Sequence, residues 1–400
     1  MKILVLNCGS SSIKYKLFDM TSKEVLAQGG IEKINLPGSF LKFTLPNGEK
    51  KIIERDIKEH TSGVKFILEV LTDPEYGFVK DLHEIQAVGH RVLHGGTKFS
   101  GSVLINDAVI AAVEECCDLG PLHNPANLKG IYAIKELLPE VPQVAVFDTA
   151  FHQTMPEKAY LYPIPYKYFE QYGIRRYGFH GTSHRYVSKR VCEFLNIPAE
   201  GSRIITCHVG NGGSIAAVKD GKCVDTTMGL TPLEGLMMGT RSGDIDGGAV
   251  LYIMKKEGLN PDEMSNLLNK KSGILGVFGK SSDMRELAAG VAAGDEAAKR
   301  AEDMYFYRIT KYIGAYAAAM GGVDVILFTG GVGENQAEAR SISCAPLAFM
   351  GVKLDEEKNK TVHGEEAIIS TPDSKVKVVV IPTDEELMIA SDTEEICSKL

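Results

Sequence analysis

The start of the chain alternates between apolar and polar positions with the two-residue period of a β-strand. Residues 2–6 are mostly apolar, a turn rich in serine and glycine covers 7–12, and apolar residues then alternate with polar ones over 13–17. This pattern predicts a β-hairpin. A second hairpin is predicted over 40–53, because Pro46-Asn47-Gly48 can supply the positive φ angles of a tight turn.

Helical and strand-like segments then follow one another. The spacing of apolar residues predicts helices at about 58–71, 107–118 and 125–138, with short apolar strands at 85–89 and 143–147. Strands followed by an alternation of helices and strands indicate a mixed α/β domain.

The second half of the chain repeats the opening pattern. Tyrosine and proline become frequent over 149–175, where no period is sustained, which predicts a crossing into another domain. A short apolar strand at 203–208, a glycine-rich turn at 210–213 and a strand at 215–218 then repeat the first hairpin. A repeat at about half the chain length indicates two similar α/β halves facing a cleft.

The elements after this hairpin continue the α/β pattern. We expect a long helix at about 295–319, a strand at 323–329, a helix opened by Gly330–Asn335, a last strand at 376–381 and a terminal helix from about 384.

Length and charge limit the kind of protein. The 400 residues correspond to two or three domains at about 150 residues each. We expect an N-terminal α/β domain of 1–149, against which a helix of about 386–400 packs, and a C-terminal α/β domain of 150–385. The net charge of −8 gives no general attraction to nucleic acid or anionic lipid. Apolar runs stop far short of the roughly 20 residues of a membrane-spanning helix, so neither nucleic acid nor a membrane is an expected partner.

The cysteines and the N-terminus indicate a cytoplasmic location. Residues 1–6 hold too few apolar residues for an export signal. The eight cysteines show no CxxC spacing, which is typical of thiols in a reducing compartment.

Three glycine-rich turns follow predicted strands and can bind an anion. Asn7–Lys14 combines small residues, whose backbone N–H groups can converge on a phosphate, with serine hydroxyls and one ammonium group. The same strand-turn-strand context recurs at 208–214, and 330–335 opens a helix whose dipole can face a nucleotide. One such turn is equally well explained as an ordinary hairpin turn. Three of them after three strands favour a nucleotide-binding cleft.

One further glycine segment is misleading. Gly273–Ser281 resembles a Walker A loop, but five residues rather than four separate its outer glycines. We interpret it as a loop between helices. No GxGxxG motif follows a strand, which disfavours a Rossmann dinucleotide site.

Two arginines lie in glycine-rich irregular segments, one in each half. They are Arg91, within Gly89–Gly96, and Arg241, within Thr240–Asp244. Each alone is most often a solvated or ion-paired side chain. The pair fits a cleft that holds an anion from both sides, because a guanidinium fork matches carboxylate and phosphate oxygens. Asp148 ends an apolar strand, at the edge where ligand sites of α/β sheets gather, although a helix cap explains it equally well.

The other polar candidates are weaker. His180 and His184 lie four residues apart, but the segment lacks the glutamate of a zinc-protease helix and has a glycine where helix is needed, so we expect no metal there. His123 precedes a helix and can be a cap residue. Glu385 and Glu386 begin the terminal helix, where acidic side chains suit the helix dipole without any further role.

The segments Asn7–Lys14 and Gly89–Gly96 together resemble the two signature segments of the acetokinase family, and the similarity runs from residue 3 to 383–386. The family belongs to the superfamily of sugar kinases, heat-shock ATPases and actin. The resemblance therefore implies two duplicated α/β domains of the ribonuclease-H-like type flanking a nucleotide cleft, in agreement with the repeat. It also implies reversible, direct in-line phosphoryl transfer from ATP to acetate, giving acetyl phosphate and ADP, with Mg²⁺ or Mn²⁺ as the metal. A homodimer is expected on the same ground.

The resemblance also assigns roles to residues of this chain. The metal ligands would be Asn7 and Glu385, with Glu386 as the alternative to Glu385. The catalytic groups would be Arg91, Asp148, His180, Arg241 and His123. Acetate would be bound by Arg91, at its carboxylate, and by an apolar acyl pocket formed by Leu93, Leu122, Phe179 and Pro232. The nucleotide would be held by Lys14, Ser12, His208, Asn211, Gly212, Gly213, Asp283, Met284, Arg285, Gly331 and Asn335, which makes the C-terminal domain the nucleotide-binding domain.

At three positions the chain differs from the residue common in the family. Met284 stands where phenylalanine is usual and Val332 where isoleucine is usual, so adenine packing changes only slightly. Leu93 stands where valine is common, and its extra methylene, worth about 0.8 kcal/mol when buried, should narrow the acyl pocket. Such a pocket discriminates about 10- to 200-fold per methylene, so acetate is favoured and some use of propionate is expected.

The residue types suit this chemistry. A carboxylate is already a nucleophile at neutral pH, so the obstacle is repulsion between anions, which two arginines, a histidine and Mg²⁺ would reduce. We expect Arg91→Ala and Arg241→Ala to keep the fold and to lose nearly all turnover. The alternatives are a propionate or butyrate kinase of the same family and a non-enzymatic ATP-binding module of the superfamily. Arg91, Arg241 and His180 in one chain disfavour the module, because a nucleotide switch needs no site for a second anion.

Overall fold

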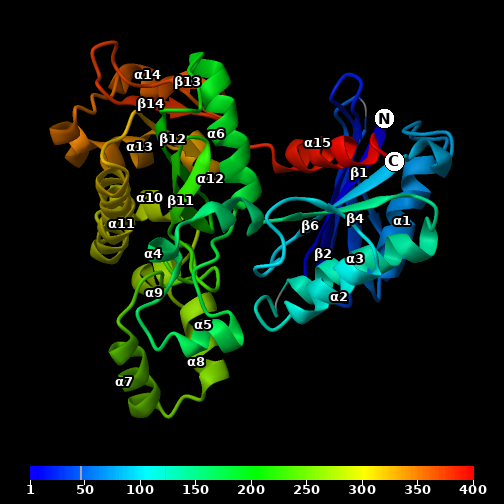
Figure 1. Cartoon of the computed structure of the whole chain (residues 1–400), viewed down its shortest axis with the longest axis horizontal. Coiled ribbons are helices and arrows are strands. Elements are labelled where there is room, and N and C mark those ends of the chain that lie inside the picture. Colours follow the sequence, from blue (N-terminus) through cyan, green and yellow to red (C-terminus); the bar gives the residue numbers. More distant parts are fainter. Residues whose placement is uncertain (46, 122) are drawn as a thin grey trace. The chain divides into compact units, whose positions relative to one another are not determined.

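The computed structural model describes residues 1–45, 47–121 and 123–400, and these divide into two compact units. Unit 1 is Met1–Gln153 together with Asp384–Leu400, and unit 2 is Thr154–Thr383. Unit 1 contains the blue and cyan segments of Figure 1 and the red terminal helix, so the chain returns to its first unit at the end. Each unit is built on one β-sheet.

The sheet of unit 1 has eight strands in the order β5-β4-β3-β2-β1-β6-β8-β7. Their bounds are β1 Lys2–Cys8, β2 Ser12–Asp19, β3 Glu24–Glu32, β4 Phe40–Thr44, β5 Lys50–Glu54, β6 Ala87–Val92, β7 Val103–Leu104 and β8 Gln143–Phe147. From β1 to β5 the neighbours run antiparallel, whereas β1, β6 and β8 run parallel. Both predicted hairpins are confirmed, and Pro46 of the second lies outside the described residues.

The helices of unit 1 cover both faces of its central strands. They are α1 His60–Thr72, α2 Asp107–Glu115, α3 Asn124–Leu137 and α15 Glu385–Cys397, with 3₁₀-helices η1 Leu82–Glu84 and η2 Ala150–Thr154. Leu4 and Leu6 of β1 pack in the core that holds α1 and α3, whereas Ile3 and Val5 pack against α15. Successive side chains of a strand point to opposite faces, so a strand covered on both faces reads as a continuous apolar run. This explains why β1 does not alternate, while β2, with half-buried Lys16, does.

His90 in β6 makes the stability of unit 1 depend on pH. Its side chain is 2% exposed and its Nε2 donates to Oε1 of Gln143 at 2.8 Å. Burial lowers the pKa of His90 from 6.5 to about 4. As the pH falls the unfolded chain is protonated first, so the stability that is complete above about pH 6.5 is lost towards pH 4.

We therefore expect His90 to account for about 2 kcal/mol of the unfolding free energy lost between pH 7.5 and pH 5. The measurement is urea denaturation at both pH values for the wild type and for His90→Gln. The variant should lose less stability than the wild type by that amount, and an equal loss in both proteins would contradict the assignment.

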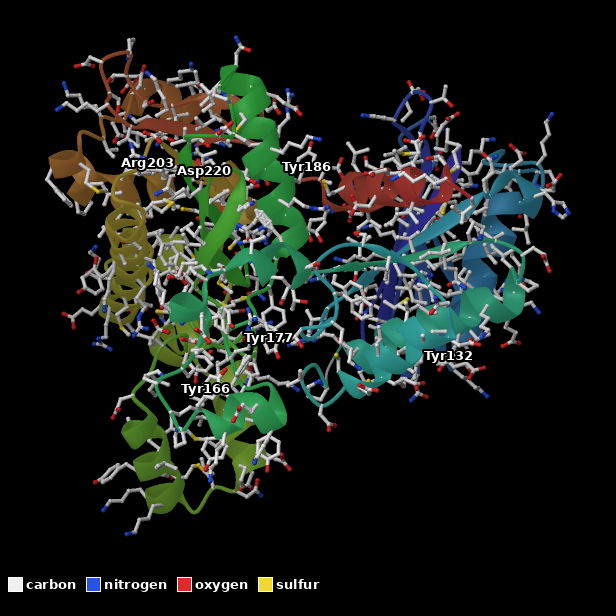
Figure 2. All side chains as sticks on the ribbon, viewed as in Figure 1. Tyr132, Tyr166, Tyr177, Tyr186, Arg203 and Asp220 are labelled. Carbon is white, nitrogen blue, oxygen red and sulfur yellow. The ribbon has the colours of Figure 1, made fainter. Side chains whose placement is uncertain are left out.

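The sheet of unit 2 has six strands in the order β11-β10-β9-β12-β14-β13. Their bounds are β9 Arg203–Val209, β10 Gly213–Lys219, β11 Lys222–Thr226, β12 Val325–Thr329, β13 Ala367–Ile368 and β14 Lys377–Val380. Arg203 begins β9 and Asp220 follows β10, and Figure 2 shows them at the same end of this antiparallel hairpin.

The helices of unit 2 surround this sheet and extend beyond it (Figure 1). They are α4 Glu157–Tyr160, α5 Lys167–Tyr172, α6 Gly181–Leu195, α7 Gly247–Glu257, α8 Pro261–Lys270, α9 Gly273–Phe278, α10 Met284–Ala292, α11 Glu296–Met320, α12 Gly330–Asn335, α13 Ala337–Cys344 and α14 Glu356–Thr361, with the 3₁₀-helix η3 Ala345–Met350. The apolar face of α11 packs in the same core as β9, β10 and β12. Neither α11 nor any other helix among the described residues is long and apolar enough to cross a membrane.

The central strands of the two sheets share one topology. In unit 1 the antiparallel set β3-β2-β1 is followed by the parallel strands β6 and β8, and in unit 2 the antiparallel set β11-β10-β9 is followed by β12 and β14. The hairpins β1-β2 and β9-β10 each pair over seven residues. The duplicated α/β architecture predicted from these two hairpins is confirmed.

The prediction of a loop over Gly273–Ser281 is wrong for most of its length, because Gly273–Phe278 forms helix α9. Ile274 and Phe278, four residues apart, are both buried in the core of unit 2, so packing turns this short apolar run into a helix. The segment follows helix α8 rather than a strand, which agrees with the conclusion that it is not a Walker A loop.

Candidate active site

Arg91 and Asp148 form an ion pair at the carboxyl ends of the parallel strands in unit 1. Arg91 lies in β6 and Asp148 directly follows β8, the parallel neighbour of β6. Nε and one terminal nitrogen of Arg91 lie 3.1 and 2.6 Å from the two carboxylate oxygens of Asp148, which is fully buried. Desolvation would lower the pKa of Arg91, but the carboxylates of Asp148 and Glu385 raise it above its ordinary value. Arg91 therefore stays charged and is held in one orientation by a bidentate ion pair with Asp148.

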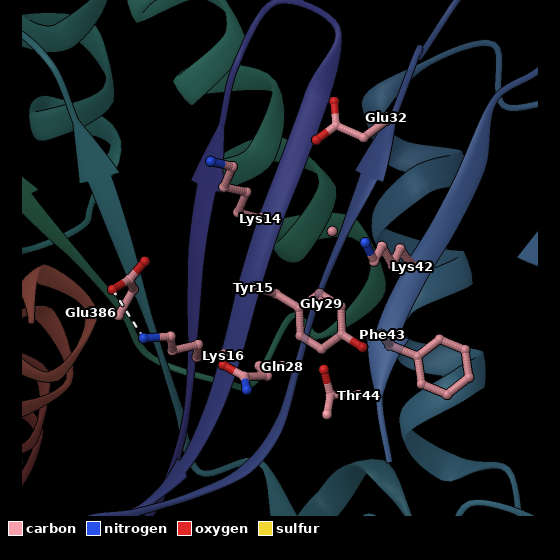
Figure 3. Close-up of a pocket in the computed structure, with 11 residues that line it drawn as sticks. Lys14, Tyr15, Lys16, Gln28, Gly29, Glu32, Lys42, Phe43, Thr44 and Glu386 are labelled. Carbon is pink, nitrogen blue, oxygen red and sulfur yellow. Dashed lines mark hydrogen bonds and ion pairs between the residues drawn. The ribbon is translucent and has the colours of Figure 1, made fainter. Parts of the chain in front are cut away.

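The terminal helix α15 brings a second carboxylate, that of Glu385, near Arg91. Desolvation raises the pKa of Glu385 to about 7; the charge of Arg91 opposes this rise, and the charges of Asp148 and Glu386 add to it. Glu386 has another partner, because its carboxylate accepts a hydrogen bond from Nζ of Lys16 at 3.2 Å, the dashed contact in Figure 3. Of the two glutamates, Glu385 is therefore the better candidate for a metal ligand.

A hollow of about 200 Å³ lies beside Arg91 in unit 1. It is lined by Asn7, Cys8, Gly9, Ser12, Lys14, Arg91, Leu93, His123 and Asn127. The structure thus brings together one predicted metal ligand, Asn7, with predicted phosphate and acyl residues of this unit, whereas Glu385 does not line the hollow. Lys14 also borders a second, more open hollow on the face of β2, β3 and β4, shown in Figure 3. Leu122 lies outside the described residues.

Asn127 is a residue of this site that the sequence analysis missed. It is buried in α3, where its Nδ2 donates to the carbonyl of Cys8 at 2.8 Å and its Oδ1 accepts from the N–H of Leu93 at 3.0 Å. One side chain thereby ties the turn after β1 to the segment after β6. A polar residue on the buried face of a helix was the available signal.

Two glycine-rich turns meet at one edge of the unit 2 sheet. The first, 210–213, joins β9 to β10, and the second begins α12 after β12, the parallel neighbour of β9. Gly330 has a φ of +78°, and a Cβ there would lie 2.8 Å from the carbonyl oxygen of Val209, so only glycine fits. A Cβ at Gly331 would meet no described atom within 4 Å. The backbone at this position is open to a ligand.

Glu334, also missed, fixes the second turn. One oxygen of its carboxylate accepts hydrogen bonds from the N–H groups of Gly330 at 2.8 Å and Thr383 at 3.1 Å. The side chain of Asn335 donates to the carbonyl of Gly331 at 3.0 Å. The turn is therefore held in one shape by its own helix.

Arg241 lies against the first glycine turn. A Cβ on Gly212 would be 3.7 Å from a terminal nitrogen of Arg241 and 3.9 Å from Nε2 of His180, so the three residues are neighbours. The guanidinium group donates to the carbonyl of Pro232 at 3.2 Å. Among the described residues no carboxylate forms an ion pair with Arg241, and desolvation lowers its pKa. A partly buried cation without a counter-ion suits an anionic ligand.

His180 is held at the start of α6 in a left-handed backbone conformation, with a φ of +54°. Its ring stacks on that of His208 with 4.3 Å between ring centres, and its Nδ1 lies 2.9 Å from Oγ of Ser214. Phe179, the preceding residue, is buried. The argument that a glycine excludes helix between His180 and His184 is wrong, because Gly181 is the first residue of α6, where glycine costs less than in a helix interior.

The predicted adenosine residues lie near the second turn. Met284 and Arg285 line a hollow of about 520 Å³ together with Gln336, the neighbour of Asn335. Asp283 caps α10 and forms an ion pair with Arg285 at 2.6 Å.

Known proteins resemble this chain over its full length. The model of the acetokinase family matches residues 2–391. An acetate kinase of Phocaeicola vulgatus is 73% identical over 399 residues, with 100% of each chain covered. Among solved structures, the acetate kinase of Porphyromonas gingivalis is 60% identical with a TM-score of 0.96, and a propionate kinase from Francisella tularensis is 42% identical with a TM-score of 0.92. Both alignments cover 99% of each chain, so the likeness includes both units.

Proposed function

This chain belongs to the acetokinase family and is a phosphotransferase with a carboxyl group as acceptor, and from this premise we propose how its side chains carry out the reaction. The reaction is the reversible transfer of a phosphoryl group from ATP to acetate, giving acetyl phosphate and ADP. In the proposed in-line path an acetate oxygen forms a bond to the γ-phosphorus while the bond from that phosphorus to the β,γ-bridging oxygen breaks.

The main obstacle is the repulsion between two anions. Acetate is ionised at neutral pH, so its carboxylate needs no strong base to act as nucleophile. Catalysis must position it against the triphosphate and cancel charge on the transferred group. We assign Arg91 to the acetate carboxylate and the phosphoryl group, Arg241 to the same phosphoryl group, and His180 to the transition state. Asp148 orients Arg91.

The observation that carries this assignment is that the guanidinium group of Arg91 is held in a fixed orientation, while that of Arg241 has no carboxylate partner among the described residues. Asp148 fixes Arg91 by two hydrogen bonds, and a terminal nitrogen of Arg91 points towards Oδ1 of Asn7 at 3.4 Å, within the hollow of unit 1. Arg241 lies beside a glycine turn and has no carboxylate partner among the described residues. Cations that are oriented before the reaction stabilise developing charge without reorganising. His123, in the same hollow as Arg91, is a supporting group.

The residues of unit 1 fit a magnesium ion. Asn7 offers an amide oxygen and Glu385 a carboxylate, and Mg²⁺ prefers such donors, one or two carboxylates together with substrate phosphates. Desolvation and the neighbouring carboxylates raise the pKa of Glu385, and a bound divalent cation would stabilise its charged form. Asn7 and Glu385 supply only two donors, so water and phosphate oxygens would complete the coordination of the ion. A bound Mg²⁺, or Mn²⁺ in its place, neutralises charge on those oxygens.

ATP is assigned mainly to unit 2. Its phosphates would lie at the glycine turns, against Asn211, Gly212, Gly213 and Gly331, near His208, with Ser12 and Lys14 of unit 1 contributing donors. The hollow lined by Met284 and Arg285 would take the adenosine. Asp283 would hold Arg285 in place, and Asn335 would hold the backbone of the second turn.

Trapping of the acyl phosphate with hydroxylamine tests the activity. The protein is incubated with Mg-ATP and acetate, propionate or butyrate in parallel reactions. The highest kcat/KM with acetate supports the proposal, and a higher value with propionate or butyrate would assign a different acid. If no acyl phosphate forms with any of the three acids, the result would support a non-enzymatic ATP-binding module.

Leu93 should limit the length of the acyl chain. It is 5% exposed and lines the hollow beside Arg91. Leu93→Ala enlarges this hollow, so we expect kcat/KM for propionate relative to acetate to rise by about tenfold, within the 10- to 200-fold range for one methylene. Leu93→Val, which removes one methylene, should give a smaller rise. If the ratio of kcat/KM for propionate to that for acetate is unchanged in both variants, Leu93 does not line the acyl pocket.

A homodimer is part of the proposal, and an exposed apolar surface of unit 2 supports it. Leu251 and Tyr252 on α7 and Tyr307 on α11 are 69%, 63% and 66% exposed. Ile245 and Tyr307 line a hollow of about 360 Å³. Large exposed apolar side chains are frequent at protein–protein interfaces, and a second copy of the chain is the proposed partner.

We also propose a cytoplasmic location. None of the eight cysteines forms a disulfide among the described residues, and seven of the eight are buried. Cysteines that form no disulfide are typical of proteins that stay in a reducing compartment.

A further inference from the structure

Tyr162, Arg176 and Glu234 form a polar cluster in unit 2 that the mechanism proposed above does not use. A terminal nitrogen of Arg176 donates to Oε1 of Glu234 at 2.7 Å, and the hydroxyl of Tyr162 donates to Oε2. Desolvation would lower the pKa of Arg176, but the charge of Glu234 raises it above its ordinary value. Both carboxylate oxygens of Glu234 therefore have a donor, and we refer to the three side chains as the Glu234 cluster.

The Glu234 cluster holds the backbone of the segment 226–234, of which Glu234 is the last residue. The other terminal nitrogen of Arg176 donates to the carbonyl of Thr226 at 2.8 Å. The N–H of Leu230 donates to the hydroxyl oxygen of Tyr162 at 3.0 Å. Beyond Thr226 the segment is described throughout and forms no helix or strand. The cluster therefore supplies hydrogen bonds that regular secondary structure would otherwise provide.

Gly229, in the middle of this segment, lets the cluster pack closely against the backbone. A Cβ at this position would overlap Oε2 of Glu234 and the hydroxyl oxygen of Tyr162, so only glycine leaves room for both. The carbonyl of Gly229 accepts hydrogen bonds at 3.1 and 3.2 Å from the N–H groups of the two residues before Phe179. The segment 226–234 is therefore fixed against the residues that lead into α6.

Pro232, two residues before Glu234, connects the held segment to Arg241. Its carbonyl accepts a hydrogen bond from a terminal nitrogen of Arg241 at 3.2 Å. The same nitrogen lies 3.8 Å from Sδ of Met238, and a thioether accepts hydrogen bonds only weakly. Among the described residues no carboxylate forms an ion pair with Arg241. The carbonyl of Pro232 is therefore the contact that orients this guanidinium group.

We propose that Glu234 is a positioning residue for the reaction, which holds Pro232 where its carbonyl orients Arg241 towards the transferred phosphoryl group. This inference rests on the role proposed above for Arg241. Arg176 and Tyr162 act together with Glu234, because each of them contacts both its carboxylate and the backbone of the segment 226–234. The cluster itself needs no contact with substrate. It reduces the reorganisation that Arg241 must undergo before the transfer.

The first test removes parts of the cluster and separates kcat from KM. Glu234→Ala should lower kcat about 10- to 100-fold, with KM for ATP within about threefold of the wild type, because the glycine turns assigned to the phosphates keep their own contacts. Glu234→Gln keeps an acceptor for Arg176 and should recover part of kcat. Tyr162→Phe removes one hydroxyl and should cause a smaller loss. An unchanged kcat in both Glu234→Ala and Tyr162→Phe would overturn the inference.

Asp324→Ala is the matched control for the loss of an ion pair. Asp324 binds Arg203 through both carboxylate oxygens, at 2.8 and 3.1 Å. Arg203 begins β9, whereas the first glycine turn follows the end of that strand, so this pair lies at the opposite end of the sheet. Asp324→Ala should keep the kcat of the wild type under conditions in which urea denaturation shows it to be folded. A loss of kcat as large as that in Glu234→Ala would overturn the inference, because it would reflect general destabilisation.

The second test asks whether Glu234 acts through Arg241. It compares kcat in the wild type, Glu234→Ala, Arg241→Ala and the double variant. Once the arginine is absent, Glu234 has no guanidinium group to position, so Glu234→Ala should lower kcat by less than about threefold in the Arg241→Ala background. A loss by the same factor in both backgrounds would overturn the inference, because it would mean that Glu234 acts independently of Arg241.

These measurements also separate the inference from the function on which it rests. If Arg241→Ala keeps full turnover, the catalytic role of Arg241 is wrong, whatever the effect of Glu234→Ala. If Arg241→Ala is nearly inactive but Glu234→Ala is as active as the wild type, Arg241 is oriented without the Glu234 cluster and only the further inference fails.

Discussion

Replacing Arg241 with alanine is expected to lower kcat by about 10³- to 10⁵-fold without lowering the stability of the protein. The guanidinium group lies beside Gly212 and Nε2 of His180, where the transferred phosphoryl group is proposed to bind. Its removal takes away charge that the transition state needs. It also removes a partly buried cation that has no carboxylate partner among the described residues, so the free energy of unfolding should not fall.

Acyl phosphate formation and urea denaturation measure the two effects separately. Arg241→Lys is the matched control, because lysine keeps a point charge but loses the planar fork that binds phosphate oxygens. We expect kcat of Arg241→Lys to remain at least about tenfold below that of the wild type. Activity of Arg241→Ala within tenfold of the wild type would reject the catalytic role, and a loss of several kcal/mol of stability would contradict the view that this cation lacks a partner.

Replacing Arg91 with alanine should have an equally large effect on turnover but a different effect on stability. The carboxylate of Asp148 is fully buried and is paired with Arg91 at 2.6 Å. Without Arg91 this charge is left uncompensated, and removing one partner of a buried pair costs about 3–5 kcal/mol. The structure therefore revises the expectation that the fold tolerates both arginine variants equally, because only Arg91 has such a partner.

A second substitution separates the two consequences of losing Arg91. Arg91→Ala combined with Asp148→Asn replaces the unpaired carboxylate with a neutral amide and should recover most of the lost stability. It should not recover turnover, because the cation is still absent. Recovery of activity together with stability would mean that Arg91 serves the fold rather than the reaction.

The parts of the fold that depend on local pattern could be predicted from the sequence. The hairpins β1-β2 and β9-β10 follow from short apolar strands around polar glycine turns, and their likeness predicts the repeat of the two sheets. Asp148 was recognisable because it follows an apolar strand, where an α/β sheet gathers polar groups. Arg91 was recognised from its glycine-rich segment, but it lies in strand β6 rather than in an irregular segment.

The parts that depend on contacts between distant segments could not be predicted in this way. Lys16 binds the carboxylate of Glu386, which lies 370 residues away in the sequence. This contact leaves Glu385 as the better candidate for a metal ligand, and no local sequence pattern predicts it. Asn127 and Ser214 are single polar residues whose partners lie on other elements. Helix α9 was missed because burial in the core of unit 2, rather than its short sequence, makes it helical.

The account depends on Arg91 and Arg241, one from each unit, acting on the same phosphoryl group. A double-mutant cycle tests this directly by comparing kcat/KM for ATP, at saturating acetate, in the wild type, Arg91→Ala, Arg241→Ala and the double variant. Residues that act together on one transition state give strongly non-additive losses. We therefore predict that kcat/KM of the double variant is within about tenfold of that of the less active single variant. Losses that multiply in full would contradict the account, because they would mean that the two arginines act independently.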